Sequence, residues 1–446
     1  MIDEELQIAE VVRLMCSESG RTPSPSPCKS RARATTSRYR AESHLAHPSP
    51  DGSLRVYKRQ ALDCPQAKRA PGSSRSGGSA AEGPGGGSAA EGAGWRESSE
   101  VLRRTEMTGG SQSLLGAGAL VLRTASPRGK ISVTRGAWAE YVAGKVGLGG
   151  DRGVGAQDRA GCSGRASLGP PPGRPARPEL PRVVGGRWTP SPKEAERDLG
   201  VGPAAFCLHS LAHIELNAVD LAWDSAVRWG VVGASSGRGA FASASTPAGS
   251  GPGLPPPRVD AERALEDAAA RVLSDEAARR EFVEDFAQTA DDEARHLGMC
   301  MDRLEELGAP YGVLDSHDEL WRCAEVTRHS LAARLAVVPM VQEARGLDAG
   351  PRHVKRLEGI PDDASAAIVA QIVREEEAHV QVGVKWFRVV CAEAGVDPAE
   401  TFRELCLAYA PKRALMEPFN DPARERVGLT RDWYSGLGAL GTPAHS

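Results

Sequence analysis

The spacing of apolar residues divides the chain into a helical second half and a long first part with little periodicity. Between residues 203 and 393, apolar side chains recur every three or four positions, which is the spacing of helices that bury one face. This pattern predicts an all-α fold. The predicted long helices span about 203–229, 260–308 (in one or two pieces), 319–346 and 364–393. Pro339 is expected to kink the third of them.

Ionisable residues interrupt the apolar stripe of each predicted helix. The stripes of the first and third helices each contain one Glu, and those of the second and fourth each contain a Glu-x-x-His pair. The two pairs lie in "TADDEARHLGMCMDRLEEL" and "IVREEEAHVQVGVKWF". In chain order the six residues are Glu215, Glu293, His296, Glu343, Glu376 and His379. A buried carboxylate without a partner costs several kcal/mol, so these positions call for a counterion.

The six residues predict a site for two metal ions. A Glu and a His three positions apart lie one helical turn apart on neighbouring rows, so both can bind one ion. One Glu from each of two helices and a Glu-x-x-His pair from each of two others is the ligand set of di-iron and di-manganese carboxylate bundles. Four carboxylates neutralise two divalent ions, and one imidazole per ion leaves positions open for dioxygen or substrate. We expect two iron ions, with manganese as the alternative, and assign no separate catalytic residue.

Each acid taken alone has an ordinary interpretation as a solvated or salt-bridged helix residue. Glu375 and Glu377 are alternatives to Glu376, and either is also consistent with a charged surface face. We prefer Glu376 because it reproduces the Glu-x-x-His offset of the second helix.

Two histidines and a cysteine near the predicted ligands have simpler roles. His209 and His213 are close to Glu215 in sequence but point to another side of the helix, so we expect packing or orientation of the site rather than metal binding. Cys300 follows His296 by about one turn on the same stripe, where a small buried side chain is the default interpretation.

Composition predicts three regions. Residues 1–111 are rich in Gly, Ser, Pro and Arg and are predicted to be mostly disordered. Residues 112–202 form an irregular to helical lead-in with an extended, proline-rich segment. Residues 203–446 form the di-metal bundle, with a low-complexity insertion at 230–257 and a C-terminal tail.

Charge and cysteine content narrow the class of protein. The net charge of −3 does not favour a general nucleic-acid or membrane-surface protein, and no apolar run is long enough to span a bilayer. The acidic start "MIDEELQIAEVV" is unlike a secretory leader, and the nine cysteines form no C-x-x-C pair. We expect a cytoplasmic protein without a membrane partner, and an organelle is the alternative because a Ser/Arg-rich stretch follows the start.

Several segments resemble a known family. They are "PGRPARPEL", "LAHIELNAVDLAWD", "DDEARHLGMCMDRLEELGAPYG", "HDELW", "RLAVVPMVQEARGLD", "EEEAHVQVGVKWF" and "EPFNDPARERVGL". Together they resemble the ferritin-like family catalogued as a domain of unknown function, which is similar to the hydroxylase of methylthio-isopentenyl-adenosine in transfer RNA. The resemblance runs from about residue 113 to 440. It implies a ferritin-like four-helix bundle, with a di-iron centre at the six residues above and no assigned substrate. Glu377 and the 230–257 insertion depart from the family pattern.

The leading functional hypothesis is a non-haem di-iron hydroxylase or monooxygenase. Its partners would be dioxygen, an unknown substrate and an electron donor, with transfer RNA as a substrate by analogy only. The alternatives are an iron-binding or ferroxidase protein without an organic substrate, and a metal-free helical interaction scaffold.

Overall fold

The computed structural model describes residues 113–149, 174–182, 191–231, 259–360 and 362–440. Within these ranges every regular element is helical, and the only β-type pairing is an isolated bridge between Ser113 and Gly147. The predicted all-α fold class is therefore confirmed for this part of the chain. The predicted disordered region 1–111 and nearly all of the predicted insertion 230–257 lie outside the described residues.

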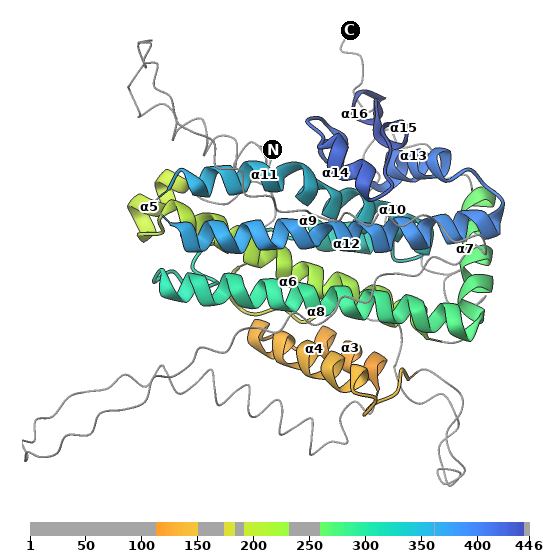
Figure 1. Cartoon of the computed structure of the whole chain (residues 1–446), viewed down its shortest axis with the longest axis horizontal. Helices are drawn as coiled ribbons and strands as arrows, with labels where there is room; N and C mark the ends of the chain where they lie inside the picture. The colour runs from red at the N-terminus through yellow and green to blue at the C-terminus, as the bar shows by residue number, and fades with distance from the viewer. Residues whose placement is uncertain (1–112, 150–173, 183–190, 232–258, 361, 441–446) are drawn as a thin grey trace, which may run out of the picture. The chain divides into compact units, whose positions relative to one another are not determined.

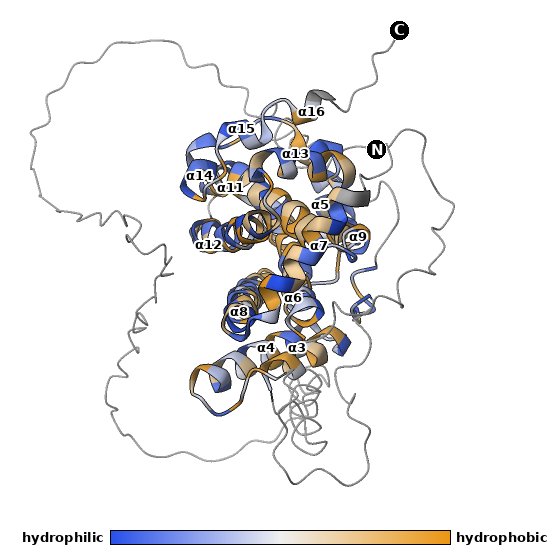
Figure 2. Cartoon of the chain, turned by 90° about the vertical axis from the view of Figure 1, so that its right-hand side faces the viewer, coloured by the Kyte–Doolittle hydropathy of each residue, from blue (hydrophilic) through white to orange (hydrophobic). Residues whose placement is uncertain are grey.

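Four long helical segments, which lie roughly parallel to one another in Figure 1, carry the six predicted ligands. They are α6 (Pro203–Gly230), α8 (Glu276–Glu306), the continuous run from α10 to α11 (Leu331–Glu358), and α12 (Asp363–Ala394). Helix α6 packs against α8, and α12 packs against the α10–α11 run and against α8. Figure 2 shows hydrophilic residues on the outer sides of α8 and α12 and hydrophobic residues facing the other helices, as the sequence periodicity requires.

Shorter helices complete the described fold. Before α6 they are α3 (Leu114–Arg123), α4 (Pro127–Val142) and α5 (Pro192–Leu199), and α7 (Val259–Ser274) precedes α8. The C-terminal ones are α13 (Pro398–Tyr409), η3 (Lys412–Leu415), α14 (Asp421–Arg426), α15 (Arg431–Tyr434) and α16 (Leu437–Leu440). Helix α3 packs closely on α6 because Gly118 has no side chain: a Cβ there would lie 2.3 Å from the ring of Trp223. None of the helices in the described ranges is long and apolar enough to cross a bilayer.

The predicted third helix, 319–346, was wrong in its continuity and its end. The chain forms α9 (Glu319–Val326), stops, and restarts at α10 (Leu331–Val337), where the Ser330 side chain accepts a hydrogen bond from the Ala333 N–H. That cap provides a favourable helix start, and it accounts for the break. Pro339 does not simply kink the helix. Residues Val338–Glu343 form a six-residue π-helix (η2), which then continues as α11 (Ala344–Glu358).

Apolar side chains form two main cores on either side of the predicted site. One core joins the first half of α6 to the second half of α8 and the start of α12, through residues such as Leu208, Leu304 and Ile372. The other lies toward the opposite ends of these helices and includes Trp223 and Phe387. Each fully buried large side chain contributes about 1.5–3 kcal/mol, so the two cores hold the helices together without help from the polar section between them.

Candidate metal centre

The structure brings five of the six predicted ligands together. Glu215 of α6, Glu293 and His296 of α8, and Glu376 of α12 offer ligand atoms that all lie within 4.8 Å of one another. His379 of α12 joins them, because its Nδ1 lies 2.9 Å from Glu293 Oε1 and 3.3 Å from Glu376 Oε2. All five residues are buried between the two apolar cores.

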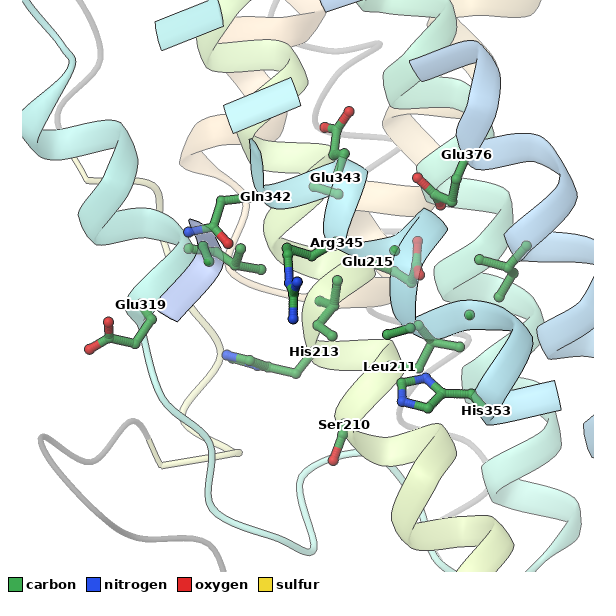
Figure 3. Close-up of a pocket in the computed structure, with 18 of the residues that line it drawn as sticks. Ser210, Leu211, His213, Glu215, Glu319, Gln342, Glu343, Arg345, His353 and Glu376 are labelled. Atoms are coloured by element: carbon green, nitrogen blue, oxygen red, sulfur yellow. The ribbon is translucent and has the colours of Figure 1, made fainter. Parts of the chain in front are cut away.

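Glu343 lies at the end of η2 and falls outside that 4.8 Å group. It lines the same cavity as Glu215, Glu293 and Glu376, and Figure 3 shows Glu215, Glu343 and Glu376 entering this cavity from three different helices. Burial raises the pKa of Glu343 to about 8; His379 opposes the shift, and Glu293 and Glu376 add to it. Short π-helical segments are frequent at functional sites, and this one ends at Glu343.

The four glutamates make no ion pair with Lys or Arg within the described part of the chain; their charged neighbours are the two histidines. Three buried polar atoms of the cluster have no hydrogen-bond partner: Glu215 Oε2, Glu343 Oε2 and His379 Nε2. Buried polar atoms are normally paired, and a cation among the carboxylates would satisfy the two glutamate oxygens, whereas His379 Nε2 faces Asp292 at 3.7 Å. Carboxylate oxygens with two imidazoles suit iron or manganese.

Without a metal, protons are shared within the cluster. Burial alone would lower the pKa of His296, but carboxylates around it, Glu215 among them, raise it well above its usual value. Burial opposes the shift at Glu293 too, yet His379 and His296 hold its pKa well below the usual range. Burial alone would also lower the pKa of His379, but Glu293 and Glu376 raise it well above its usual value, so both imidazoles favour the protonated form in the metal-free cluster.

Two further carboxylates contact the histidines from outside the cluster. Glu375 Oε2 lies 2.7 Å from His296 Nε2, and Asp292 Oδ2 lies 3.7 Å from His379 Nε2. The contacts are crossed, because each acid directly precedes the Glu-x-x-His pair of one helix and faces the histidine of the other. Arg295 joins them, with Nη2 at 2.6 Å from Glu375 and 2.7 Å from Asp292. Carboxylates in this position orient metal-binding imidazoles.

Sequence reasoning missed this role. It offered Glu375 as a charged surface residue or an alternative ligand, whereas its side chain is only 16% exposed and bonds to His296. The available signal was the acid directly before each Glu-x-x-His pair. Glu377 does lie toward the surface, where it pairs with Arg426 at 2.5 Å.

The other candidates near Glu215 serve packing. His213 bonds to the Tyr311 hydroxyl at 2.8 Å through Nδ1 and to the His317 carbonyl at 2.7 Å through Nε2. His209 Nε2 accepts a hydrogen bond from the Gly312 N–H at 2.9 Å. Both histidines thus fasten the loop after α8, and burial lowers the pKa of each to about 4. Cys300 is fully buried in the apolar core, as predicted.

A cavity of about 590 Å³ extends from the cluster between α6, α11 and α12. Four of the predicted ligands line one part of it: Glu215, Glu293, Glu343 and Glu376. Much of the remaining wall is apolar and includes Phe206, Ile214, Val369 and Ile372. A cavity of this size with a few convergent polar groups is typical of a small-molecule site.

Comparison with known proteins gives two matches. A family model described as "Protein of unknown function (DUF455)" matches residues 123–435, a range that contains all six predicted ligands. An uncharacterised protein of Haemophilus influenzae is 30% identical over 259 residues, which cover 57% of this chain and 75% of that protein. No solved structure matched the chain.

Proposed function

The chain belongs to the family described as "Protein of unknown function (DUF455)", and from its site we propose a di-iron carboxylate oxidoreductase that activates dioxygen, as a hydroxylase or monooxygenase. We propose further that α6, α8, the α10–α11 run and α12 constitute a ferritin-like four-helix bundle. The observation that carries the proposal is the buried cluster of glutamates without Lys or Arg partners, beside a cavity large enough for an organic molecule.

The donor positions suggest how two ions would share the ligands. Glu293 and Glu376 each lie within 4 Å of both imidazoles, at 3.4 and 2.9 Å for Glu293 and at 3.7 and 3.3 Å for Glu376. These two carboxylates would therefore help to hold metal beside either imidazole. Glu215 would complete the set on the His296 side, and Glu343 on the His379 side.

The chain's own residues would position the reactants. Bound iron supplies dioxygen activation with electrons from a separate donor, so that one oxygen atom enters a substrate C–H bond and the other leaves as water. The apolar cavity wall, for example Phe206 and Ile372, would hold the substrate and limit the access of water. The crossed contacts from Asp292 and Glu375 would hold the two imidazoles in orientation.

The cavity favours this function over the alternatives. A ferroxidase without an organic substrate has no use for an apolar cavity of about 590 Å³ beside the ligands. A metal-free scaffold leaves the unpaired carboxylate oxygens unexplained. Transfer RNA is a candidate substrate only by analogy with the hydroxylase named above.

Metal analysis tests the proposal. The full-length chain is reconstituted anaerobically with ferrous iron, desalted, and its iron content measured by mass spectrometry, beside Glu293→Gln and Glu376→Gln. We expect roughly two ions per wild-type chain and a large loss in both variants. Glu377→Gln, at the surface next to Glu376, is the matched control and should keep the wild-type content. Less than about a tenth of an ion per wild-type chain would refute the di-metal site. Dioxygen uptake stimulated by a cell extract of metabolites then tests the oxygenase.

A further inference from the structure

Helix α11 leaves an open space in the cavity wall beside the glutamate cluster. Gly346 follows Glu343 by three residues, about one turn further along the helical run, and both residues line the cavity. Apart from its chain neighbours and the backbone of its own helix, a Cβ at Gly346 would meet a single described atom within 4 Å, Glu376 Cγ at 3.8 Å. That distance is an ordinary van der Waals contact. The space beside Glu376 therefore stays open because position 346 has no side chain.

Helix packing does not require this glycine. Four residues later on the same helix, Gly350 is needed for close packing, since a Cβ there would lie 2.4 Å from Val373 Cγ2 of α12. Gly346 has no neighbour that close among the described residues, and its φ is not in the left-handed region. Glycine inside a helix destabilises it relative to alanine. A residue that departs from a local preference without a packing reason is typical of a functional site.

On α6 and α12, the cavity residues one turn from the glutamates are apolar. Ala218 follows Glu215 by three residues, and Ile372 precedes Glu376 by four. Residues three or four apart lie on the same face of a helix, so each of these side chains borders its glutamate. Ala218 is 8% exposed and Ile372 is 2% exposed. A hydrocarbon group can therefore lie next to the cluster, whereas a polar group there would lose hydrogen bonds to water.

Unpaired carboxylate oxygens lie in the same cavity. Glu215 is 2% exposed, lines the cavity and has one oxygen, Oε2, without a hydrogen-bond partner. Glu343 Oε2 is unpaired in the same way. Buried polar atoms are normally paired, so these oxygens point to a ligand on the side of the cluster that Gly346 leaves open.

We propose that Gly346 is a specificity-determining residue, which admits the uncharged hydrocarbon end of an organic molecule to the space beside Glu376, facing the glutamate cluster. That this molecule is the substrate, and this end the one that reacts, rests on the proposed function. Long side chains on a helix turn back over the preceding turn, so the side chain introduced by Gly346→Leu would cover the Glu343 side of the cavity.

Calorimetry and fluorine NMR of the full-length chain with para-fluorotoluene test this. The chain is loaded anaerobically with manganous ion, which suits the same ligands and broadens the fluorine resonance of a molecule bound close to it. In wild type we expect saturable binding and manganese-dependent broadening. Gly346→Leu should weaken binding at least about tenfold and remove the broadening from the probe that still binds.

Alanine variants separate the open space from a role in folding. Gly346→Ala should raise the urea concentration at the midpoint of unfolding, because alanine favours the helix and its Cβ fits. Gly136→Ala is the matched control, since Gly136 is exposed in α4 and has no neighbour within 4 Å of an added Cβ. It should raise the midpoint and leave probe binding unchanged. Gly350→Ala should lower the midpoint because its Cβ would overlap Val373.

Four results would overturn the inference. They are the absence of probe binding to wild type, bound probe without broadening in manganese-loaded wild type, binding that Gly346→Leu leaves unchanged, and a lower unfolding midpoint for Gly346→Ala. The last result would assign the glycine to the backbone conformation after η2.

The calorimetry is repeated on the metal-free chain, so that the two proposals fail separately. If the chain binds neither manganese nor iron, the proposed function fails, yet probe binding that Gly346→Leu weakens still supports the open space at Gly346. If metal binds and the probe is indifferent to Gly346→Leu, the inference fails and the metal centre stands.

Discussion

Helix α6 buries acids of two kinds. Asp220 lies 2.6 Å from Lys130 and 2.5 Å from Arg177, and Asp224 lies 2.5 Å from Arg334 and 2.6 Å from Arg228. Both aspartates are fully buried. Glu215, about one turn before Asp220, is buried to almost the same degree, and its charged contact is a histidine that it shares with other glutamates.

The difference shows how the same helix handles buried charge in two ways. Burial raises the pKa of Asp220, and Lys130 and Arg177 oppose that shift, so the chain itself supplies the compensating cations. At Glu215 burial raises the pKa well above its usual value, and Glu293 adds to the increase. A site that collects carboxylates and supplies no fixed cation is suited to a cation from solution. On the proposed function, the aspartates serve folding and the glutamates serve metal binding.

The largest expected effect on stability comes from removing an arginine that pairs with one of the buried aspartates of α6. Arg334→Met leaves Asp224 with a single arginine and removes the Arg334 hydrogen bonds to Thr327 and Ala324. Removing one partner of a buried pair costs about 3–5 kcal/mol, so the free energy of unfolding should fall by that amount. Denaturant titration measures it, with and without iron, and both conditions should give the same loss. Arg328→Met, at an exposed position, is the control. If iron restored the lost stability, the distinction between the paired aspartates and the glutamate cluster would be wrong.

Substitutions in the glutamate cluster should not lower the free energy of unfolding of the metal-free protein. Glu215→Ala or Glu376→Ala removes a buried carboxyl group whose pKa burial raises, so the apolar cores should hold the fold equally well or better. Iron at a hundredfold excess over its Kd should stabilise wild type by about 2.7 kcal/mol and leave these variants unchanged. Thermal unfolding of metal-free and iron-loaded samples gives both quantities. Marked destabilisation of the metal-free variants would show that the cluster serves folding.

Asp292 and Glu375 contact the two histidines, so they should affect metal binding only through the orientation of these ligands. Glu375→Gln should weaken iron binding by about 10–100-fold through His296, and Asp292→Asn should do the same through His379. Competition with a chromophoric chelator measures the affinity. Glu377→Gln makes the same replacement two positions further along the helix, at the surface. It should leave the iron affinity unchanged. Equal effects of Glu375→Gln and Glu377→Gln would assign the loss to net charge.

The spacing of apolar residues along each helix predicted the bounds of two long helices and the buried positions of three glutamates. Predicted helices 203–229 and 364–393 correspond to Pro203–Gly230 and Asp363–Ala394. The stripe positions of Glu215, Glu293 and Glu376 also placed these residues in the interior, because a residue on an apolar stripe turns inward with its neighbours.

What depends on the relative placement of helices could not be predicted. Whether Glu375 faces His296 or solvent depends on the rotation and offset of α12 against α8, which spacing along one helix does not determine. The same holds for Arg334, a polar residue of a short helix that reaches Asp224 of another element. The break before α10 did have a local signal in the cap residue Ser330.

The smallest expected effect concerns a third kind of acid, which is half-buried and, among the described residues, pairs with neither an arginine, a lysine nor the cluster. Glu266 of α7 accepts a hydrogen bond from the Leu331 N–H at 3.1 Å, at the start of α10, and burial raises its pKa to about 7. The folded protein therefore holds this proton more tightly than the unfolded chain, and stability falls as pH rises from about 4.5 to about 7. Glu266→Gln removes that dependence. It should match wild type at pH 5 and exceed it by about 1 kcal/mol at pH 8, a value reduced because the side chain is partly exposed. Denaturant titrations at both pH values test this, with exposed Asp267→Asn as the control. A gain that is equal at both pH values would mean that the carboxylate is already ionised at pH 5, and that a helix start can hold a buried charge without a cation.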